Sequence, residues 1–212
     1  MSSPLIAQEK ETFPNRIRWT VPECYSLADA GYLSGRYELI DGEILTKMGQ
    51  KPPHRMTLML IANWLVSLFG KLCVQEQEPI SLPDPAGRYS EPEPDLAVTL
   101  QPTTAYAEQH PGPDDLLLLV EVADSSLEFN LTIKAPLYAR AGVQEYWVAD
   151  VQGRRLFVHR SPASDAYRSL MRLNVGEIVS LETRPEAARE VAAFFPPLPN
   201  TDNDLPPLVP SA

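Results

Sequence analysis

Two carboxylates and a lysine carry the chemistry that the sequence suggests. Asp95 follows Pro94 at the start of an apolar stretch, and Glu121 lies in the apolar run 116–122. An unbroken run of leucine and valine predicts a strand buried on both faces, where an ionised glutamate is costly unless a cation compensates it. Lys134 follows in a predicted helix that would carry it back to the same end of the sheet. Together the three residues suit metal-dependent hydrolysis of a phosphodiester.

Mg²⁺ is the ion that this arrangement favours, with Mn²⁺ as the alternative. If the strands that carry Asp95 and Glu121 are neighbours, both carboxylates project towards the edge of the sheet where such proteins place ligands. Mg²⁺ takes few carboxylates and keeps several waters, and the backbone carbonyl of Val122 could be a further ligand. Lys134 could stabilise the transition state or help to deprotonate the water, and Tyr138, four residues later, could orient it.

Each of these residues also has a structural interpretation. Glu121 could form a structural ion pair with Lys134 or an arginine, because buried carboxylates are often compensated in that way. Glu38 could be an additional carboxylate of the site or an exposed strand residue. His54 could act as a general base, although its place beside two prolines before a helix favours a residue of a loop or a first helical turn.

The first third of the chain predicts a helix, a hairpin and a second helix. Thr20 and Glu23 form a capping box around a proline, which predicts a helix over 20–30. The Asp-Gly pair at 41–42 between apolar runs predicts a two-residue β-hairpin. Residues 55–69 are apolar almost all round, which is typical of a helix buried in the core or against a partner subunit.

The middle of the chain predicts six strands and one helix. The strands are expected at 73–82, 89–98, 116–122, 145–150, 154–159 and 167–173, and the helix at 130–141. The first two strands would flank a proline-containing turn. The strands on either side of the helix should be parallel, because crossover units of this kind join parallel strands. The elements together predict an α/β fold.

Length and composition are those of one domain with its own core. The chain has 212 residues, of which 44% are hydrophobic and 22% are charged. We expect an N-terminal arm, a single domain and a proline-rich tail at 1–18, 19–195 and 196–212. The N-terminal region lacks the apolar segment of a signal peptide, and no run reaches the roughly 18 apolar residues of a membrane span. The two cysteines, Cys24 and Cys73, show neither a zinc nor a disulfide pattern, so we expect a cytoplasmic protein without a membrane anchor.

Charge is distributed unevenly along the chain. The net charge of -10 argues against a protein whose affinity comes mainly from phosphate contacts. Residues 81–130 hold ten acidic side chains and one basic one, whereas residues 131–172 hold seven basic and three acidic ones. An acidic centre beside a basic half would suit a divalent cation next to a polyanion, although charge runs are often solvated surface.

A series of motifs, in this order, resembles one bacterial family. The motifs are Tyr37-Glu38-Leu39-Ile40-Asp41-Gly42-Glu43, Pro94-Asp95, Val120-Glu121-Val122, Lys134, Tyr138-Ala139 and the run 142–150. From about Thr20 to Asp150 they are similar to the Uma2 family, endonucleases of the PD-(D/E)XK, restriction-endonuclease-like superfamily. The resemblance implies a restriction-endonuclease-like αβββαβ core with a mixed sheet and flanking helices, Mg²⁺ at Asp95 and Glu121, and hydrolysis of phosphodiester bonds in DNA.

Two positions depart from the pattern that the resemblance implies. The residue two after Glu121 is Ala123, where the superfamily has a lysine, so Lys134 from the following helix would supply the amino group. Family members often have aspartate at the position of Asn130. If that aspartate is catalytic, the activity of this chain is in question, whereas an aspartate that caps the helix is replaced equally well by asparagine.

Two functions of different classes follow from these observations. The first is a metal-dependent DNA endonuclease, in which Asp95, Glu121 and Lys134 are catalytic and Val122 joins the two carboxylates as a metal ligand. The second is a catalytically silent fold of the same kind that acts as a dimeric interaction or nucleic-acid-binding module. The intact triad favours the first, and the acidic composition favours the second. We expect a homodimer, because the helix at 55–69 could bury one face in its own core and another in a partner.

Overall fold

The computed structural model of the protein describes residues 17–47 and 49–197. In chain order the elements are α1 (Val21–Asp29), β1 (Tyr37–Ile40), β2 (Glu43–Thr46), α2 (Pro52–Phe69), η1 (Lys71–Cys73), β3 (Val74–Glu76), α3 (Ala86–Tyr89), β4 (Leu96–Thr99), η2 (Thr103–Tyr106), η3 (Pro113–Asp115), β5 (Leu116–Ala123), α4 (Leu127–Phe129), η4 (Asn130–Lys134), α5 (Ala135–Ala141), β6 (Glu145–Asp150), β7 (Arg155–Pro162), β8 (Tyr167–Asn174), β9 (Ile178–Leu181), β10 (Arg184–Glu190) and η5 (Val191–Phe194). Residues 1–16 and 198–212, which make up most of the predicted arm and tail, lie outside the described part.

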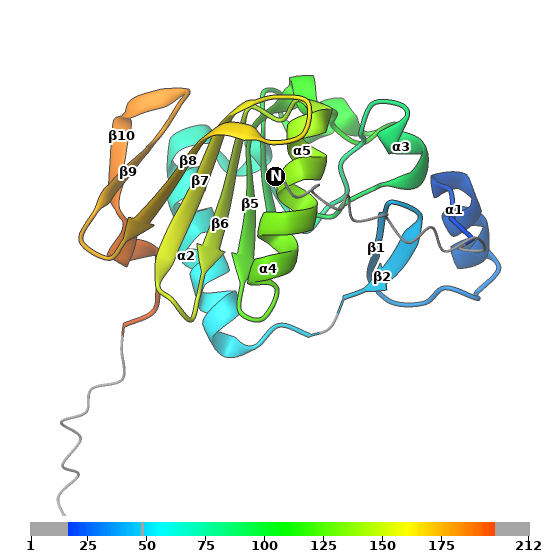
Figure 1. Cartoon of the computed structure of the whole chain (residues 1–212), viewed down its shortest axis with the longest axis horizontal. Helices are drawn as coiled ribbons and strands as arrows, with labels where there is room; N and C mark the ends of the chain where they lie inside the picture. Colours follow the sequence, from blue (N-terminus) through cyan, green and yellow to red (C-terminus); the bar gives the residue numbers. More distant parts are fainter. Residues whose placement is uncertain (1–16, 48, 198–212) are drawn as a thin grey trace, which may run out of the picture.

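One mixed sheet with helices on both faces forms the centre of the fold (Figure 1). Its strand order is β3-β4-β5-β6-β7-β8, in which β5 and β6 are parallel and the other neighbouring pairs are antiparallel. α2 covers one face, and α5 covers the other. The sequence from α2 through β3, β4, β5 and α5 to β6 gives the predicted αβββαβ core. The predicted fold class is therefore confirmed.

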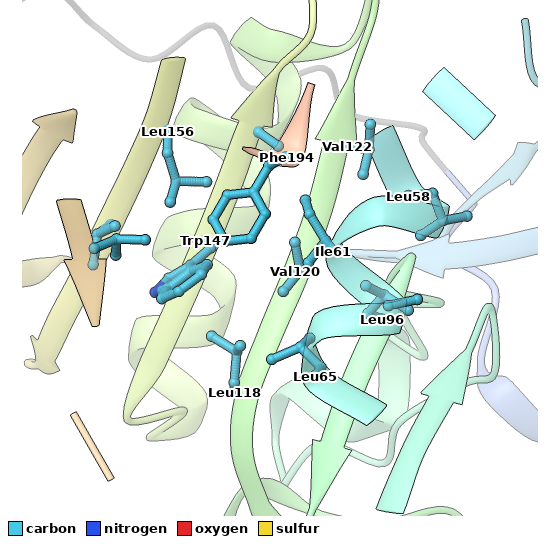
Figure 2. Close-up of a cluster of buried hydrophobic side chains, with 14 of the residues drawn as sticks. Leu58, Ile61, Leu65, Leu96, Leu118, Val120, Val122, Trp147, Leu156 and Phe194 are labelled. Atoms are coloured by element: carbon cyan, nitrogen blue, oxygen red, sulfur yellow. The ribbon is translucent and has the colours of Figure 1, made fainter. Parts of the chain in front are cut away.

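The core on the α2 side explains the apolar character of this helix (Figure 2). Its residues Leu58, Ile61 and Leu65 are buried against the sheet, and Trp64 stacks on Trp147 at a centroid distance of 6.0 Å. The helix begins at Pro52, three residues before its predicted start, because proline in the first turn does not need a hydrogen-bond partner. No helix in the described ranges is long and apolar enough to cross a membrane.

The β1–β2 hairpin forms as the Asp-Gly pair predicts. Asp41 and Gly42 both have positive φ angles, 50° and 84°, as the two central residues of a type I′ turn require. A Cβ atom at Gly42 would lie 2.9 Å from the Cα of Arg18. The bridge between Leu39 and Glu91 attaches the hairpin to the chain that enters β4, so the side chains of β1 are fixed relative to the sheet.

The prediction of two long strands at 73–82 and 89–98 is wrong. The structure has β3 and β4, which are three and four residues long and pair with each other. Prolines interrupt the chain between them, and proline cannot donate a hydrogen bond to a ladder. These prolines are Pro79, Pro83, Pro85, Pro92 and Pro94. The predicted turn is present at Asp84 and Pro85, and the short helix α3 follows it.

Two further elements differ from the sequence-based prediction. The helix predicted over 130–141 begins at Leu127, and its residues Asn130–Lys134 form one π-helical turn. β9 and β10 form a separate antiparallel hairpin that was not predicted. β10 is mostly exposed and contains four charged residues, so it lacks the apolar alternation that marks a strand.

Candidate active site

A cavity of about 380 Å³ brings the predicted site residues together. It is lined by side chains of the hairpin segment, the β4–β5 pair and the beginnings of α2 and α4. Asp95, Glu121, Val122 and Lys134 all line it. The structure thus places the four sequence-predicted residues at one cavity, and their catalytic and metal-binding roles stay predictions.

The register of β4 and β5 positions the two carboxylates. Leu96 pairs with Val120 in this antiparallel ladder, so the next residues outward, Asp95 and Glu121, stand opposite each other. Residues that stand opposite across a ladder point to the same face of the sheet. For Glu121 this is also the face of Leu119, which packs towards α5. The helix that carries Lys134 therefore covers the face on which the carboxylates lie.

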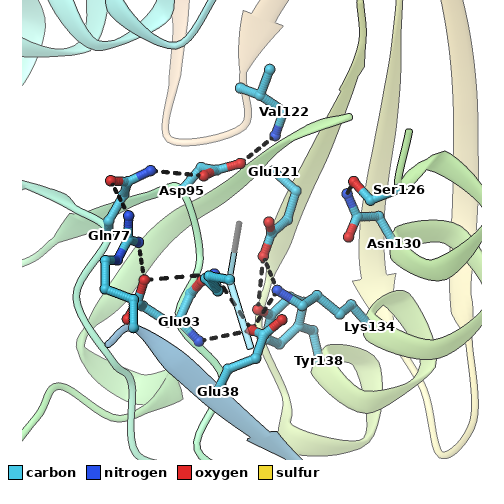
Figure 3. A network of polar contacts seen from close by, with 12 residues as sticks. Glu38, Gln77, Glu93, Asp95, Glu121, Val122, Ser126, Asn130, Lys134 and Tyr138 are labelled. Atoms are coloured by element: carbon cyan, nitrogen blue, oxygen red, sulfur yellow. Dashed lines mark hydrogen bonds and ion pairs between the residues drawn. The ribbon is translucent and has the colours of Figure 1, made fainter. Parts of the chain in front are cut away.

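Neighbouring groups hold Asp95 in its ionised form (Figure 3). Its Oδ2 accepts a hydrogen bond from the Val122 amide at 2.8 Å and lies 3.4 Å from Nε2 of His54. Its Oδ1 accepts a hydrogen bond from Nε2 of Gln77 at 3.3 Å. Burial raises the pKa of Asp95, but the contact with His54 and the Val122 amide outweigh burial, so the net pKa lies below its usual value. Asp95 is thus a carboxylate at neutral pH, the form that binds a metal.

Glu121 is buried and bound through one of its two oxygens. Oε1 lies 2.7 Å from Nζ of Lys134 and accepts a hydrogen bond from the hydroxyl of Tyr138 at 3.3 Å. Burial raises the pKa of Glu121 above its usual value, although the charge of Lys134 opposes this effect. Tyr138 therefore contacts the same Glu121 oxygen as Lys134, and its role in orienting Lys134 stays a prediction. Because both contacts use Oε1, they leave Oε2 for a further ligand.

Lys134 is a buried ammonium between two carboxylates. Nζ lies 2.7 Å from Oε1 of Glu121 and 2.7 Å from Oε2 of Glu38 (Figure 3), and the side chain is 2% exposed. Burial lowers the pKa of Lys134, but the two carboxylates outweigh burial and raise it above its usual value. The amino group is therefore charged at neutral pH.

Glu38 is the main residue whose place in the site the sequence left open. It is 6% exposed, so the alternative of an exposed strand residue is wrong. Besides Lys134, its Oε2 contacts the backbone amide of Glu93 at 3.2 Å and Nζ of Lys47 at 3.7 Å. Lys47 and Arg36 in turn contact Glu93. A strand of four residues shows too little alternation to reveal which of its faces is buried. Only the position of Glu38 in the family-like motif therefore indicated that this residue belongs to the site.

His54 and Asn130 line the same cavity. His54 lies in the first turn of α2, as its sequence context favours, and its Nδ1 is buried without a hydrogen-bond partner among the described residues. Asn130 lies within the helical segment, where its Nδ2 donates a hydrogen bond to Oγ of Ser126 at 3.3 Å. The helix begins after Ser126, so the interpretation of Asn130 as the helix cap is wrong.

The charge pattern indicated one of the cations beside the cavity, Lys134, but not the others. In the basic half of the chain, Arg155 forms an ion pair with Asp150 at 2.7 Å, and Arg160 forms one with Glu145 at 2.6 Å. These arginines are therefore engaged within the fold. The cations that line the cavity are Arg36, Lys47, Lys51 and Lys134.

The donor groups of the cavity fit a magnesium ion. Asp95 and Glu121 supply carboxylate oxygens to the lining, and Val122, whose amide contacts Asp95, lines the cavity as well. In the part of the chain that the structure describes, no three His, Cys, Asp or Glu side chains form a metal-binding group. Mg²⁺ is commonly held by one or two carboxylates with waters in its remaining positions, so Asp95 and Glu121 would suffice as its carboxylate ligands.

Comparison with known proteins connects this geometry to a family. The family model of Uma2, described as "Putative restriction endonuclease", matches residues 24–192. The chain belongs to the Uma2 family. The Uma2 match includes every residue that lines the cavity. This description agrees with the resemblance that the motifs indicated.

A solved structure has a similar fold. It is that of a "putative nuclease belonging to DUF820" from Anabaena variabilis ATCC 29413, with a TM-score of 0.60 and 14% sequence identity. The similarity covers 80% of this Uma2 chain and 96% of that chain. At this identity the likeness concerns the fold alone. No curated protein matches the sequence.

Proposed function

We propose that this Uma2 protein is an endonuclease that hydrolyses phosphodiester bonds in DNA with the help of Mg²⁺ or Mn²⁺. One observation carries the proposal: Asp95, which directly precedes β4, and Glu121, which follows the paired residue Val120 on β5, line one cavity with Lys134. Membership of a nuclease family supports a nucleic-acid substrate. We also propose a cytoplasmic location, as the sequence predicts.

The proposed mechanism assigns a separate task to each side chain. Asp95 and Glu121, with the carbonyl of Val122, would hold the ion, which supplies a water of lowered pKa and offsets charge on the phosphate. Lys134 stabilises the negative charge that develops on the phosphate. The alternative role, deprotonation of the water, requires a neutral amine, and the raised pKa of Lys134 disfavours that form.

One observation favours a second function. Lys134 contacts both Glu121 and Glu38, and Lys47 also contacts Glu38, so two cations of the protein compensate these two carboxylates. The same residues could then persist as a structural network in a protein that binds a partner or nucleic acid without cutting it. Metal binding distinguishes this silent module from the nuclease.

A panel of DNA substrates tests the proposed function. We expect cleavage of at least one of plasmid, linear, single-stranded and branched DNA when Mn²⁺ or Mg²⁺ is present, and no cleavage after chelation. Asp95→Ala is expected to abolish the activity, because it removes a metal-binding carboxylate. Products that form equally fast with Asp95→Ala would come from a contaminant. Absence of both cleavage and metal binding in the wild-type protein would favour the silent module.

We also expect a homodimer that uses the outer face of α2. Met56 and Met59 are 41% and 47% exposed on this helix, whereas Trp64 is covered by Phe194 of the same chain. The apolar surface left for a partner is therefore narrower than the sequence suggested. Light scattering at micromolar concentration should give twice the monomer mass of 23.6 kDa. A particle of 23.6 kDa would contradict the dimer and leave the proposed chemistry intact.

A further inference from the structure

Lys134 is held by two carboxylates that come from separate parts of the fold. Glu121 belongs to β5 in the central sheet, and Glu38 belongs to β1 in the hairpin. Each carboxylate oxygen lies 2.7 Å from Nζ of Lys134. A buried ammonium requires such compensation, because an unpaired buried charge is strongly destabilising. The proposed chemistry assigns a task to Glu121 and none to Glu38.

A metal ion on Glu121 would compete with Lys134 for the same carboxylate. The ion and the ammonium are both positive, so an ion at the site weakens the attraction between Glu121 and Lys134. The second carboxylate then has to keep the ammonium in place. Glu38 can do so because contacts outside β5 fix its position. Its Oε2 accepts a hydrogen bond from the backbone amide of Glu93, and the neighbouring Leu39 forms a β-bridge with Glu91.

We propose that Glu38 is a positioning residue, which keeps the Lys134 ammonium in the cavity while Glu121 binds the metal ion. The inference rests on the proposed function and deepens it. It gives the hairpin a role in the reaction, since Glu38 lies on β1 and not on a strand of the central sheet.

Glu93 is the matched control for this proposal. It is also a carboxylate that is 6% exposed, and it belongs to the same network. Its side chain contacts Arg36 and Lys47 rather than Lys134. A loss that stems only from a weakened network should therefore be similar in Glu38→Gln and Glu93→Gln.

The first experiment compares kcat, KM and metal binding of the two variants. With Mn²⁺ we expect Glu38→Gln to lower kcat by about 100-fold, the size of effect that loss of one well-placed electrostatic contact produces. KM and the Mn²⁺-induced rise in melting temperature should stay close to wild type. Glu93→Gln should keep most of the wild-type kcat. An equal loss in both variants, or loss of the Mn²⁺-induced rise in Glu38→Gln, would overturn the proposal.

A double-mutant comparison separates positioning from stability. If Glu38 acts through Lys134, then adding Glu38→Gln to Lys134→Met should not lower the residual rate further, because residues that act as a unit are not additive. A further loss of the same size as in the wild-type background would show that Glu38 acts on another group. If Glu38→Gln does not fold, Glu38→Asp replaces it, with a smaller loss of kcat expected.

The contact itself can be tested without catalysis. In Glu121→Gln, a ¹⁵N NMR signal of the Lys134 ammonium that stays protected from exchange would show that Glu38 is the only carboxylate needed to hold it. Loss of that signal would overturn the inference. A wild-type protein that neither cleaves DNA nor responds to Mn²⁺ would instead refute the proposed function, so the two failures are distinguishable.

Discussion

Saturating Mn²⁺ is expected to raise the melting temperature of the wild-type protein and to leave that of Glu121→Gln unchanged. A ligand that binds only the native state stabilises it by about 2.7 kcal/mol at a hundredfold excess over Kd. For a chain of this size, that corresponds to a rise of roughly 5–11 °C. Glutamine keeps the shape of the side chain but lacks the charge that holds the ion. Differential scanning calorimetry with and without the metal measures the difference.

Glu145→Gln is the control for this experiment. Glu145 is a buried carboxylate on β6 of the same sheet, where it contacts Arg160 and the indole of Trp147. Its replacement should lower the melting temperature and keep the Mn²⁺-induced rise. If Mn²⁺ stabilises the wild type and Glu121→Gln equally, the ion binds elsewhere and the silent module becomes the better interpretation.

Lys134→Ala should combine a large loss of stability with loss of cleavage. The change leaves Glu38 and Glu121 buried without their shared cation, and breaking a buried ion pair in this way typically costs about 3–5 kcal/mol. The rate of cleavage should fall to a small residual value because the ammonium that stabilises the phosphate is absent, whereas Mn²⁺ should still raise the melting temperature. Urea denaturation and the DNA panel measure the two effects.

Lys71→Ala provides the comparison with an exposed ion pair. Lys71 lies 2.9 Å from Glu76, and their side chains are 69% and 43% exposed. Such pairs contribute at most about 1 kcal/mol, so this variant should unfold close to the wild type and cleave normally. A Lys134→Ala protein as stable as Lys71→Ala would contradict the buried network.

The parts of the fold that local signals specify could be predicted from the sequence. The Asp-Gly pair at 41–42 specifies its hairpin because both residues tolerate positive φ angles. The apolar run that contains Glu121 specifies a buried strand, and the following helix and strand specify a parallel crossover. The placement of Asp95, Glu121 and Lys134 at one cavity followed from these same elements.

The rest of the site depends on contacts between distant segments. Glu38, Lys47 and Glu93 meet only when the hairpin docks beside the chain that enters β4, and no local pattern encodes that docking. The arginines of the basic half gave a misleading signal, since charge along a sequence does not reveal which side chains form ion pairs within the fold. Prolines limited β3 and β4 to shorter strands than apolar content suggested.

The π-helical turn at Asn130–Lys134 bears on how a family of this kind can relocate its amino group. A π turn accommodates one more residue than an α-helical turn, and each residue of an α-helix advances the side-chain direction by about 100°. Lys134 lies three and seven residues before Leu137 and Ala141 of α5, so the three residues share the helix face that packs on the sheet. The extra residue of the π turn shifts the phase of this face relative to α4. The position of the amino group is therefore tied to the packing of α5 on the sheet, and a change in that packing would move both.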